Sequence, residues 1–235
     1  MNLRKRISAA LFQNRYYDYL EYRLKKFVHE VAQSIPNGAT VLDVGAGEQQ
    51  YKHFFNHTKY TAQDLGVGDG AWDYSQLDIV SEIYSIPVPD QSFDYILCTQ
   101  VMEHLRYPDK AFAEFSRILK PGGKLFVTCP LAWKEHQIPH DFFRYTQFSL
   151  QSLGHDHGFS TVELRKVGGK FITLARLAID TNIIFGIRNR WVRYALVMCL
   201  YPFDFLLGFC AYHLDFLDTK KDLTIQYECI FKKNI

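Results

Sequence analysis

The chain has 235 residues, of which 48% are hydrophobic and 22% are charged, so it can bury a sizeable core and is not globally disordered. Its formal net charge of +2 is too small to indicate nucleic acid as a partner. The five cysteines form no CxxC pair and most lie in apolar runs, which predicts buried thiols in a reducing compartment. The apolar patch in residues 1–12 is too short for the core of a signal peptide, so we expect a cytoplasmic protein.

Predicted strands and helices alternate along most of the chain. Apolar residues at helical spacing predict a helix at 20–35, and a short helix is expected after the glycines that follow Val44. A third helix begins at Pro108, and a fourth, capped by Thr146, runs to about His157. Short apolar runs predict strands at residues 41–44, 59–63, 77–80, 93–98, 124–129, 161–167 and 224–231.

This alternation predicts an α/β fold. Most of the predicted strands are nearly continuous apolar runs, which is typical of a sheet that helices cover on both faces. Residues 171–217 interrupt the pattern before the last strand and are mostly apolar.

The first glycine-containing turn predicts a ligand site. The segment TVLDVGAGEQQY, residues 40–51, ends a strand in Gly45-Ala46-Gly47, where a ligand can approach the backbone closely. The helix expected next would offer unpaired N–H groups. Asp64 ends the second strand, where an acid can accept hydrogen bonds from both hydroxyls of a ribose, and Glu82 is a second acid near a strand end. A turn that needs glycine only for steric reasons is the alternative interpretation.

The order of these segments resembles a known family. VLDVGAGEQQY, YTAQDLG, SEIYSIPVPDQSFDYILCTQVMEHL and FAEFSRILKPGGKLFVTCP together resemble the class I S-adenosylmethionine-dependent methyltransferases, in their small-molecule branch. The resemblance is strong over residues 40–130 and looser beyond them. It implies a Rossmann-like fold with a seven-stranded, mostly parallel sheet and an antiparallel last strand. It also implies S-adenosylmethionine as the cofactor.

Carried over by position, the resemblance implies a set of cofactor-binding residues. The methionine part of the cofactor would contact Asp43, Gly45, Ala46 and Gly47. The ribose would bind Asp64, followed by Leu65, and the adenine would lie at Glu82 and Ile83. Thr99 and Gln100 would line the site beneath the sulfur.

Two positions need comment. Glu82 is preferred to Asp78 at the adenine because it stands five positions before Pro87, as the acid of the family usually does. Gln49 occupies the position where many nucleotide-binding loops keep a third glycine. A methyltransferase needs no cradle for a pyrophosphate, so this substitution suits S-adenosylmethionine better than NAD.

Candidate catalytic residues follow the fourth and fifth strands. A base is needed only if the acceptor must lose a proton, and His104 and His140 are the candidate bases. His104 can alternatively brace its loop through hydrogen bonds. No metal-ligating group is expected from the sequence. The candidate substrate-binding residues are His136, Asp141, Arg144 and Tyr145.

The loop after the fifth strand has structural interpretations as well. Asp141 and Arg144 can form an ion pair that anchors it, and Tyr145 can serve in packing. The stretch HQIPHDFFRYT, residues 136–146, also resembles one in methyltransferases of bacterial polysaccharide pathways. That second resemblance indicates a class of acceptor.

The apolar segment near the C-terminus has three interpretations. Residues 194–214 could form a helix of roughly 30 Å, but Pro202 and Asp204 at its middle argue against a transmembrane span. The first interpretation is a broken helical hairpin that contacts a membrane surface or a lipid-linked substrate through residues 188–217. The second is a lid or a homodimer surface, and the third is additional core.

We therefore expect a helical segment at 1–36, a cofactor-binding core at 37–170, an apolar helical insertion at 171–218 and the last strand of the core at 219–235. The expected activity is methylation of a small molecule, most specifically O-methylation of a saccharide or a lipid-linked glycan intermediate. Methylation of a quinone or other lipid is the alternative, and an inactive methyltransferase-like binding module is the rival from another class. We expect no nucleic-acid partner, and peripheral association with the inner face of the membrane is compatible with the apolar segment.

Overall fold

The computed structural model describes residues 15–16, 18–68, 72–178 and 187–235, which fall into two compact units. The sheet unit comprises the described parts of residues 24–131, 135–165 and 226–235. The helical unit comprises the described parts of residues 1–23, 132–134 and 166–225. The expectation for residues 1–12 lies outside the described residues.

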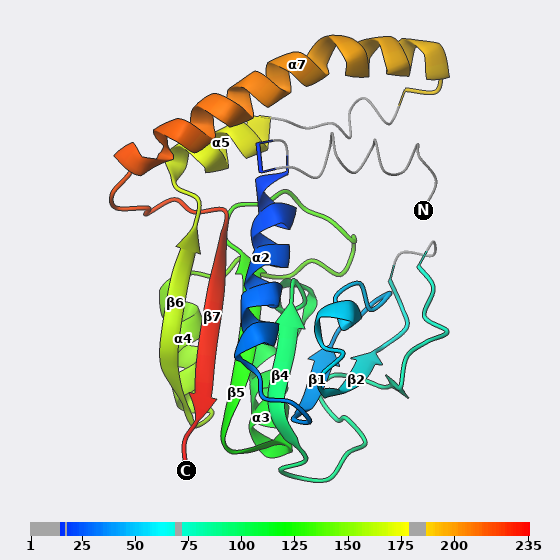
Figure 1. Cartoon of the computed structure of the whole chain (residues 1–235), viewed down its shortest axis with the longest axis vertical. Coiled ribbons are helices and arrows are strands. Elements are labelled where there is room, and N and C mark those ends of the chain that lie inside the picture. The colour runs from blue at the N-terminus through cyan, green and yellow to red at the C-terminus, as the bar shows by residue number, and fades with distance from the viewer. Residues whose placement is uncertain (1–14, 17, 69–71, 179–186) are drawn as a thin grey trace. The chain divides into compact units, whose positions relative to one another are not determined.

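Within the described residues, seven strands form one sheet in the order β3-β2-β1-β4-β5-β7-β6 (Figure 1). The first five strands pair in parallel, and β7 pairs with β5 in the antiparallel direction. The seven-stranded, mostly parallel sheet with an antiparallel last strand is therefore confirmed. The strands are β1 (Thr40–Val44), β2 (Lys59–Asp64), β3 (Ile79–Val80), β4 (Phe93–Thr99), β5 (Leu119–Pro130), β6 (Phe159–Val167) and β7 (Gln226–Lys233).

Helices cover both faces of the sheet because its central strands are apolar on both sides. Successive strand residues point to opposite faces, so Leu97 packs with α2 (Tyr19–Ser34) while its neighbours Ile96 and Cys98 pack with α3 (Pro108–Ile118). The last helix of the sheet unit is α4 (Gln147–Asp156). Its predicted cap is confirmed, since Thr146 Oγ1 accepts a hydrogen bond from the Ser149 backbone N–H at 3.2 Å.

The helix expected after the glycine turn is absent from the described residues. Only turns and the three-residue 3-10 helix η1 (Lys52–Phe54) follow β1. Gln49 has a φ of 57°, in the left-handed region, and its side-chain amide donates a hydrogen bond to the Gln76 backbone carbonyl. A residue in the left-handed region does not fit an α-helix, so no helix forms here. The prediction of helical N–H groups at this turn was therefore wrong.

The third strand is shorter than predicted. Residues 77–80 were expected to form it, but only Ile79 and Val80 pair with β2. Asp78 instead uses its carboxylate to accept a hydrogen bond from the Ala62 backbone N–H at 2.8 Å. The Asp78 backbone N–H still donates to the Ala62 carbonyl at 3.1 Å, but the Ala62 N–H is bound by a side chain and not by a strand carbonyl.

The helical unit contains α5 (Lys170–Ala178), α7 (Arg190–Leu214) and the 3-10 helix η3 (Asp215–Leu217). The buried Asp215 carboxylate accepts hydrogen bonds from the backbone N–H groups of Gly169 and Ile172, so it caps α5. A Cβ on Gly208 would lie 1.8 Å from the Tyr16 carbonyl oxygen. Glycine at this position lets the N-terminal chain pack directly against α7.

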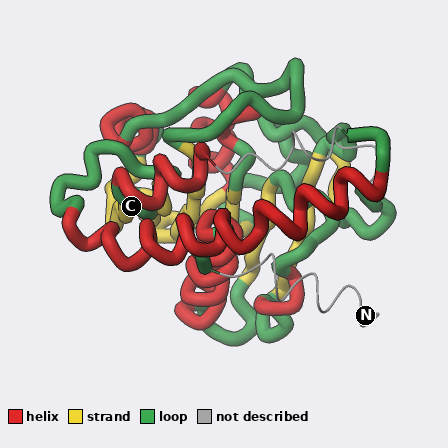
Figure 2. Tube along the Cα trace, turned by 90° about the horizontal axis from the view of Figure 1, so that it is seen from above, coloured by secondary structure: helices red, strands yellow, loops and turns green. Residues whose placement is uncertain are grey.

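The predicted break in the apolar segment is absent, because α7 is one continuous helix of 25 residues with Pro202 inside it (Figure 2). Among the described residues, Arg190–Leu217 is the one helical stretch long and apolar enough to cross a membrane by length and composition. Only 11% of its most apolar window is buried. The large exposed apolar side chains of α7 are Trp191, Val192, Tyr194, Met198, Leu200, Phe203, Leu206, Phe209 and Leu214.

Candidate functional site

The candidate site lies where the chain reverses its direction across the sheet. From β1 the chain moves outward to β2 and β3, and it then returns to place β4 on the other side of β1. The turns that follow β1 and β4 therefore meet at the carboxyl edge of the sheet. Such a switch point is the usual ligand site of an open parallel sheet.

Glycine is required at two positions of the first turn. Gly45 has a φ of 69°, and a Cβ there would lie 2.3 Å from a methyl group of Val101, which follows β4. Gly47 has a φ of 53°, and its Cβ would lie 3.2 Å from the Trp72 ring. The two glycines thus allow close packing of the turn as well as its backbone conformation. Ala46 lies between them and donates its backbone N–H to the Gln63 carbonyl at 3.0 Å.

Asp64 connects this turn to the end of β2. Its carboxylate accepts hydrogen bonds from the backbone N–H groups of Gly47 and Gly66, both at 2.9 Å. The side chain is only partly buried, and a carboxylate has about four acceptor positions, so it can also accept from a ligand. The following residue, Leu65, is 44% exposed.

The two acids considered for the adenine lie in different environments. The Asp78 carboxylate is used in the backbone of the sheet, as described above. Glu82 is exposed, while its neighbour Ile83 is 7% exposed and belongs to the hydrophobic core. The structure therefore leaves Glu82, and not Asp78, with a carboxylate directed away from the sheet backbone.

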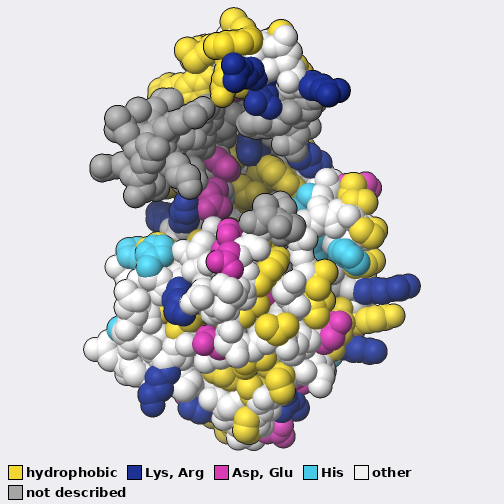
Figure 3. All heavy atoms as spheres, turned by 90° about the vertical axis from the view of Figure 1, so that its right-hand side faces the viewer, with side chains coloured by type: hydrophobic (Ala, Val, Ile, Leu, Met, Phe, Trp, Pro, Cys, Tyr) yellow, Lys and Arg dark blue, Asp and Glu magenta, His cyan; other side chains and the backbone are white. Residues whose placement is uncertain are grey.

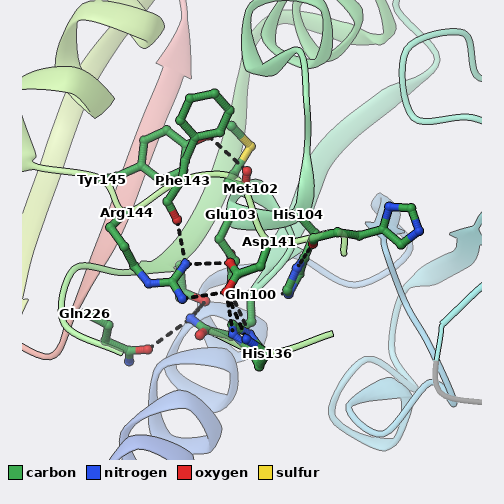
Figure 4. A network of polar contacts seen from close by, with 12 residues as sticks. Gln100, Met102, Glu103, His104, His136, Asp141, Phe143, Arg144, Tyr145 and Gln226 are labelled. Carbon is green, nitrogen blue, oxygen red and sulfur yellow. Dashed lines mark hydrogen bonds and ion pairs between the residues drawn. The ribbon is translucent and has the colours of Figure 1, made fainter. Parts of the chain in front are cut away.

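Thr99 and Gln100 lie at the end of β4, as expected for the floor of the site. Gln100 has a φ of 54°, and its side-chain amide donates to Thr128 Oγ1 and to Gln226 Oε1, both at 3.1 Å (Figure 4). These contacts join the end of β4 to β5 and β7. Gln100 is therefore positioned by the sheet itself.

The loop after β5 is fastened to the 3-10 helix η2 (Met102–His104). The Glu103 carbonyl accepts from the backbone N–H groups of Phe142 and Phe143, at 2.8 and 3.2 Å. Tyr145 is 3% exposed and donates its hydroxyl to the Met102 carbonyl at 3.0 Å. In this structure Tyr145 supports the site from within the core.

An ion pair orders the same loop. Arg144 donates two hydrogen bonds to Asp141, at 2.6 and 2.7 Å, and the Asp141 side chain is 4% exposed. This pairing lowers the pKa of Asp141 well below its usual range. Asp141 also accepts from the His136 backbone N–H at 2.9 Å and lies 3.3 Å from His136 Nδ1. The anchoring ion pair considered from the sequence is thus present, and it holds His136.

Of the two candidate bases, His104 is the one directed into this cluster (Figure 4). Its Nδ1 lies 2.6 Å from the His140 carbonyl oxygen, which can only accept, so Nδ1 carries the proton. Its Nε2 is buried and has no hydrogen-bond partner among the described residues. Burial lowers the pKa of His104, which favours the neutral ring. The His140 side chain is exposed, and His140 contributes to the site through its backbone carbonyl, which accepts from His104.

Glu103 is a site residue that was not predicted from the sequence. Its side chain is fully buried, and neither carboxylate oxygen has a hydrogen-bond partner within the described part of the chain. Oε1 lies 3.9 Å from His104 Nε2 and 4.0 Å from His136 Nε2. Burial raises the pKa of Glu103 to about 8. The signal that could have found it is an acid directly before His104 at a strand end.

Asp43 occupies a different position from that expected of a ligand contact. Its side chain lies on β1, is 3% exposed and accepts a hydrogen bond from the Tyr60 hydroxyl. Burial raises its pKa to about 7, although the Tyr60 hydrogen bond opposes the shift. Asp43 thus joins β1 to β2 beneath the glycine turn.

This fold and the turn at its switch point define a class I S-adenosylmethionine-dependent methyltransferase. A family model described as a methyltransferase domain matches residues 16–164, more than half of the chain, so the protein belongs to that family. A Burkholderia thailandensis 1,6-didemethyltoxoflavin-N1-methyltransferase with bound S-adenosylhomocysteine has a similar fold, with a TM-score of 0.57 and 14% identity. The match covers 99% of this chain and 88% of that one.

Curated relatives share part of the sequence. The chain is 34% identical over 98 residues to a malonyl-[acyl-carrier protein] O-methyltransferase of Hahella chejuensis. This match covers 37% of this chain and 35% of that protein. The chain is 32% identical over 144 residues to a 2-methyl-6-phytyl-1,4-hydroquinone methyltransferase of Synechocystis. That match covers 54% of this chain and 44% of that protein. The matched part thus spans less than half the length of either relative.

S-adenosylmethionine is the cofactor of this fold, and the residues present fit it. The glycines of the turn at Gly45–Gly47 let a ligand approach the backbone closely. Two carboxylates, that of Asp64 beside the turn and that of the exposed Glu82, can accept hydrogen bonds from hydroxyl and amino groups of the cofactor. Asp64 would hold the ribose, and Glu82 would lie at the adenine.

The buried Asp43 predicts a pH-dependent stability. Because its pKa in the folded protein exceeds the ordinary value of 3.8, the folded chain keeps a proton that the unfolded chain releases between about pH 4 and pH 7. The contribution of this group to the free energy of unfolding should fall as pH rises through that interval, by up to about 1.4 kcal/mol per pH unit. Urea unfolding at several pH values measures the slope.

Two variants test this assignment. Asp43→Asn should flatten the slope, because the amide does not titrate in this interval. Tyr60→Phe removes the hydrogen bond that opposes the shift, so it should extend the fall in stability to higher pH. An unchanged slope in Asp43→Asn would show that another group causes it.

Asp64 predicts a second measurable effect. Asp64→Ala should weaken the binding of S-adenosylhomocysteine by about ten- to a hundredfold, as expected for the loss of a charge-assisted hydrogen bond. Calorimetric titration measures the dissociation constant. Asp78→Ala is the matched control, because it removes another carboxylate that accepts from a backbone N–H near β2. Equal losses in both variants would contradict the assignment of Asp64 to the ribose.

Proposed function

We propose that this methyltransferase O-methylates a hydroxyl of a saccharide or a lipid-linked glycan intermediate. The observation that carries the proposal is the inward-facing, unprotonated Nε2 of His104 at the end of β4. A hydroxyl must lose its proton when its oxygen gains a methyl group, and a neutral imidazole can take that proton. The similarity of residues 136–146 to a stretch in methyltransferases of polysaccharide pathways supports the saccharide.

The chain's own residues have distinct tasks in this reaction. When bound, S-adenosylmethionine supplies a methyl group that is already activated. The residues after β4 and β5 then have to hold the acceptor oxygen and remove its proton. His104 is held for this by its bond to the His140 carbonyl, and Arg144 holds the loop through Asp141. The exposed rings of Phe142 and Phe143 are available to contact an acceptor.

A lipid-like hydroquinone is the second candidate acceptor. The Synechocystis relative is named for a phytylated hydroquinone, which combines a hydroxyl-bearing ring with a long apolar chain. The same base would serve a phenolic hydroxyl. Parallel assays with methyl-labelled S-adenosylmethionine and either polyprenyl-linked saccharides or prenylated hydroquinones separate the two, and label on neither class would refute both.

His104 and His140 can be compared directly. His104→Ala should lower kcat by about a hundredfold or more, while the affinity for S-adenosylhomocysteine stays unchanged. His140→Ala should have a small effect, since its backbone carbonyl, and not its ring, holds His104. The measurement is steady-state kinetics with the acceptor that the labelling assays identify. A larger loss in His140→Ala would reverse the assignment of the base.

The proposal includes a contact between α7 and an anionic membrane surface. Large apolar side chains are exposed along α7, and Arg188, Arg190 and Arg193 lie at its N-terminal end. Hydrophobic side chains and basic side chains lie side by side at the top of Figure 3. Aromatic and aliphatic groups next to arginine are typical of helices that lie in the headgroup region.

Vesicle sedimentation tests this contact. Replacing Phe203 and Leu206 together with aspartate should weaken binding to phosphatidylglycerol vesicles by at least about tenfold, because two exposed apolar side chains no longer enter the bilayer. Val162→Asp is the control, since it changes an equally exposed apolar residue on β6. If the wild-type chain does not bind vesicles but the double variant abolishes self-association, α7 is a homodimer surface instead.

A further inference from the structure

Three side chains from two segments bring donor atoms together beside the proposed base. Glu103 and His104 lie on η2, and His136 comes from the loop after β5. One ligand atom from each, a carboxylate oxygen and two imidazole nitrogens, lie within 4.8 Å of one another. Figure 4 shows the three side chains converging, with Asp141 next to them and Arg144 to the left.

The two imidazoles are oriented by contacts at their Nδ1 atoms, and the tautomer of His104 directs a lone pair into the group. His104 donates its Nδ1 proton to the His140 carbonyl at 2.6 Å, which leaves Nε2 as an acceptor. His136 Nδ1 lies 3.3 Å from the Asp141 carboxylate, so Asp141 can orient this ring. Hydrogen bonding from the second ring nitrogen to a carboxylate or carbonyl is how proteins orient metal-ligating histidines.

Glu103 provides the strongest sign of a missing partner. It is fully buried, and both of its oxygens lack hydrogen-bond partners among the described residues. A proton on the carboxyl group would not solve this, because the imidazole nitrogens lie 3.9 and 4.0 Å away, too far for a hydrogen bond. A buried carboxylate in such a position is normally paired or bound to a metal.

The distance from the carboxylate to each imidazole fits a single cation. Two donors that each lie about 2.0–2.2 Å from a metal are at most about 4.4 Å apart. The carboxylate-to-imidazole distances of 3.9 and 4.0 Å are within this limit. We propose that Glu103, His104 and His136 form a binding site for a divalent transition-metal cation.

The donor set indicates the kind of cation. Two imidazoles and one carboxylate suit Zn²⁺, Fe²⁺ or Co²⁺, whereas Mg²⁺ and Ca²⁺ prefer sites made of oxygen alone. Three protein ligands leave coordination positions open for an oxygen of the acceptor. No metal-ligating group was expected from the sequence, because spacing along the chain could not place His136 next to Glu103.

The use of the cation in catalysis rests on the proposed O-methylation but would replace His104 as its base, whereas the site itself depends on neither. With a cation bound, His104 is a ligand. Coordination would lower the pKa of the acceptor hydroxyl, and its proton would pass to water. The electron pair left on the oxygen would form the bond to the methyl carbon as the bond from that carbon to sulfur breaks. A chelator would stop such a reaction but would not affect a metal-free reaction that uses His104 as the base.

Metal binding can be measured without acceptor or cofactor, so it is independent of the proposed activity. The whole chain is dialysed against a chelator and titrated with Zn²⁺ by calorimetry and with Co²⁺ by visible absorption. We expect one equivalent of each and a Co²⁺ ligand-field spectrum. Glu103→Gln and His136→Ala should each weaken binding by at least about a hundredfold, and Asp141→Asn by about ten- to a hundredfold through the orientation of His136.

The controls make the outcome decisive. His155→Ala removes an exposed imidazole outside the group and should bind as the wild-type chain does. Circular dichroism and S-adenosylhomocysteine binding check that each variant is folded, and His136→Ala replaces Glu103→Gln if the latter does not fold. Absence of a bound equivalent in the wild-type chain, or unchanged affinity in His136→Ala, would overturn the proposal.

Discussion

The pairing of β1 with β4 is the constraint on which the candidate site depends. It places β4 beside the first strand although β2 and β3 intervene in the sequence, so the turns after β1 and β4 come together. Thr40 fixes the start of this pair, since its backbone N–H and its hydroxyl both donate to the Asp94 carboxylate, at 2.9 and 2.7 Å. Val101 then fills the space that Gly45 leaves open. The glycine turn and the acceptor side of the site are therefore parts of one packing arrangement.

The electrostatics of the acceptor side follow from that arrangement. Fastening the loop after β5 to the Glu103 carbonyl buries the Glu103 side chain and brings His136 beside it. Arg144 is the nearby permanent cation, but it is committed to Asp141 through two hydrogen bonds. The side chains around His104 therefore offer mainly hydrogen-bond acceptors. Such surroundings favour the binding of a proton donor or of a cation.

The strands and the helices of the sheet unit could be predicted because their signals are local. Apolar runs bounded by glycine and proline indicated the central strands, and the cap at Thr146 depends on residues three apart. Gln49 shows where local signals fail, since its left-handed conformation is supported by a carbonyl 27 positions away. His136 and Glu103 are 33 positions apart, and only the folded loop brings them together. Pro202 suggested a break, but no glycine accompanies it there, and α7 continues through it.

In this family the fold does not determine which molecule is methylated. Relatives of this chain are named for unrelated acceptors, a malonyl-[acyl-carrier protein] and a phytylated hydroquinone, so the glycine turn and Asp64 are not expected to specify what is methylated. The residues that can specify it are those that follow β4 and β5, where the sequence carries His104, His136 and the exposed aromatic rings. A site that gathers lone pairs around a buried carboxylate suits an acceptor that must give up a proton. An oxygen nucleophile meets that condition, and a tertiary amine, which has no proton to lose, does not.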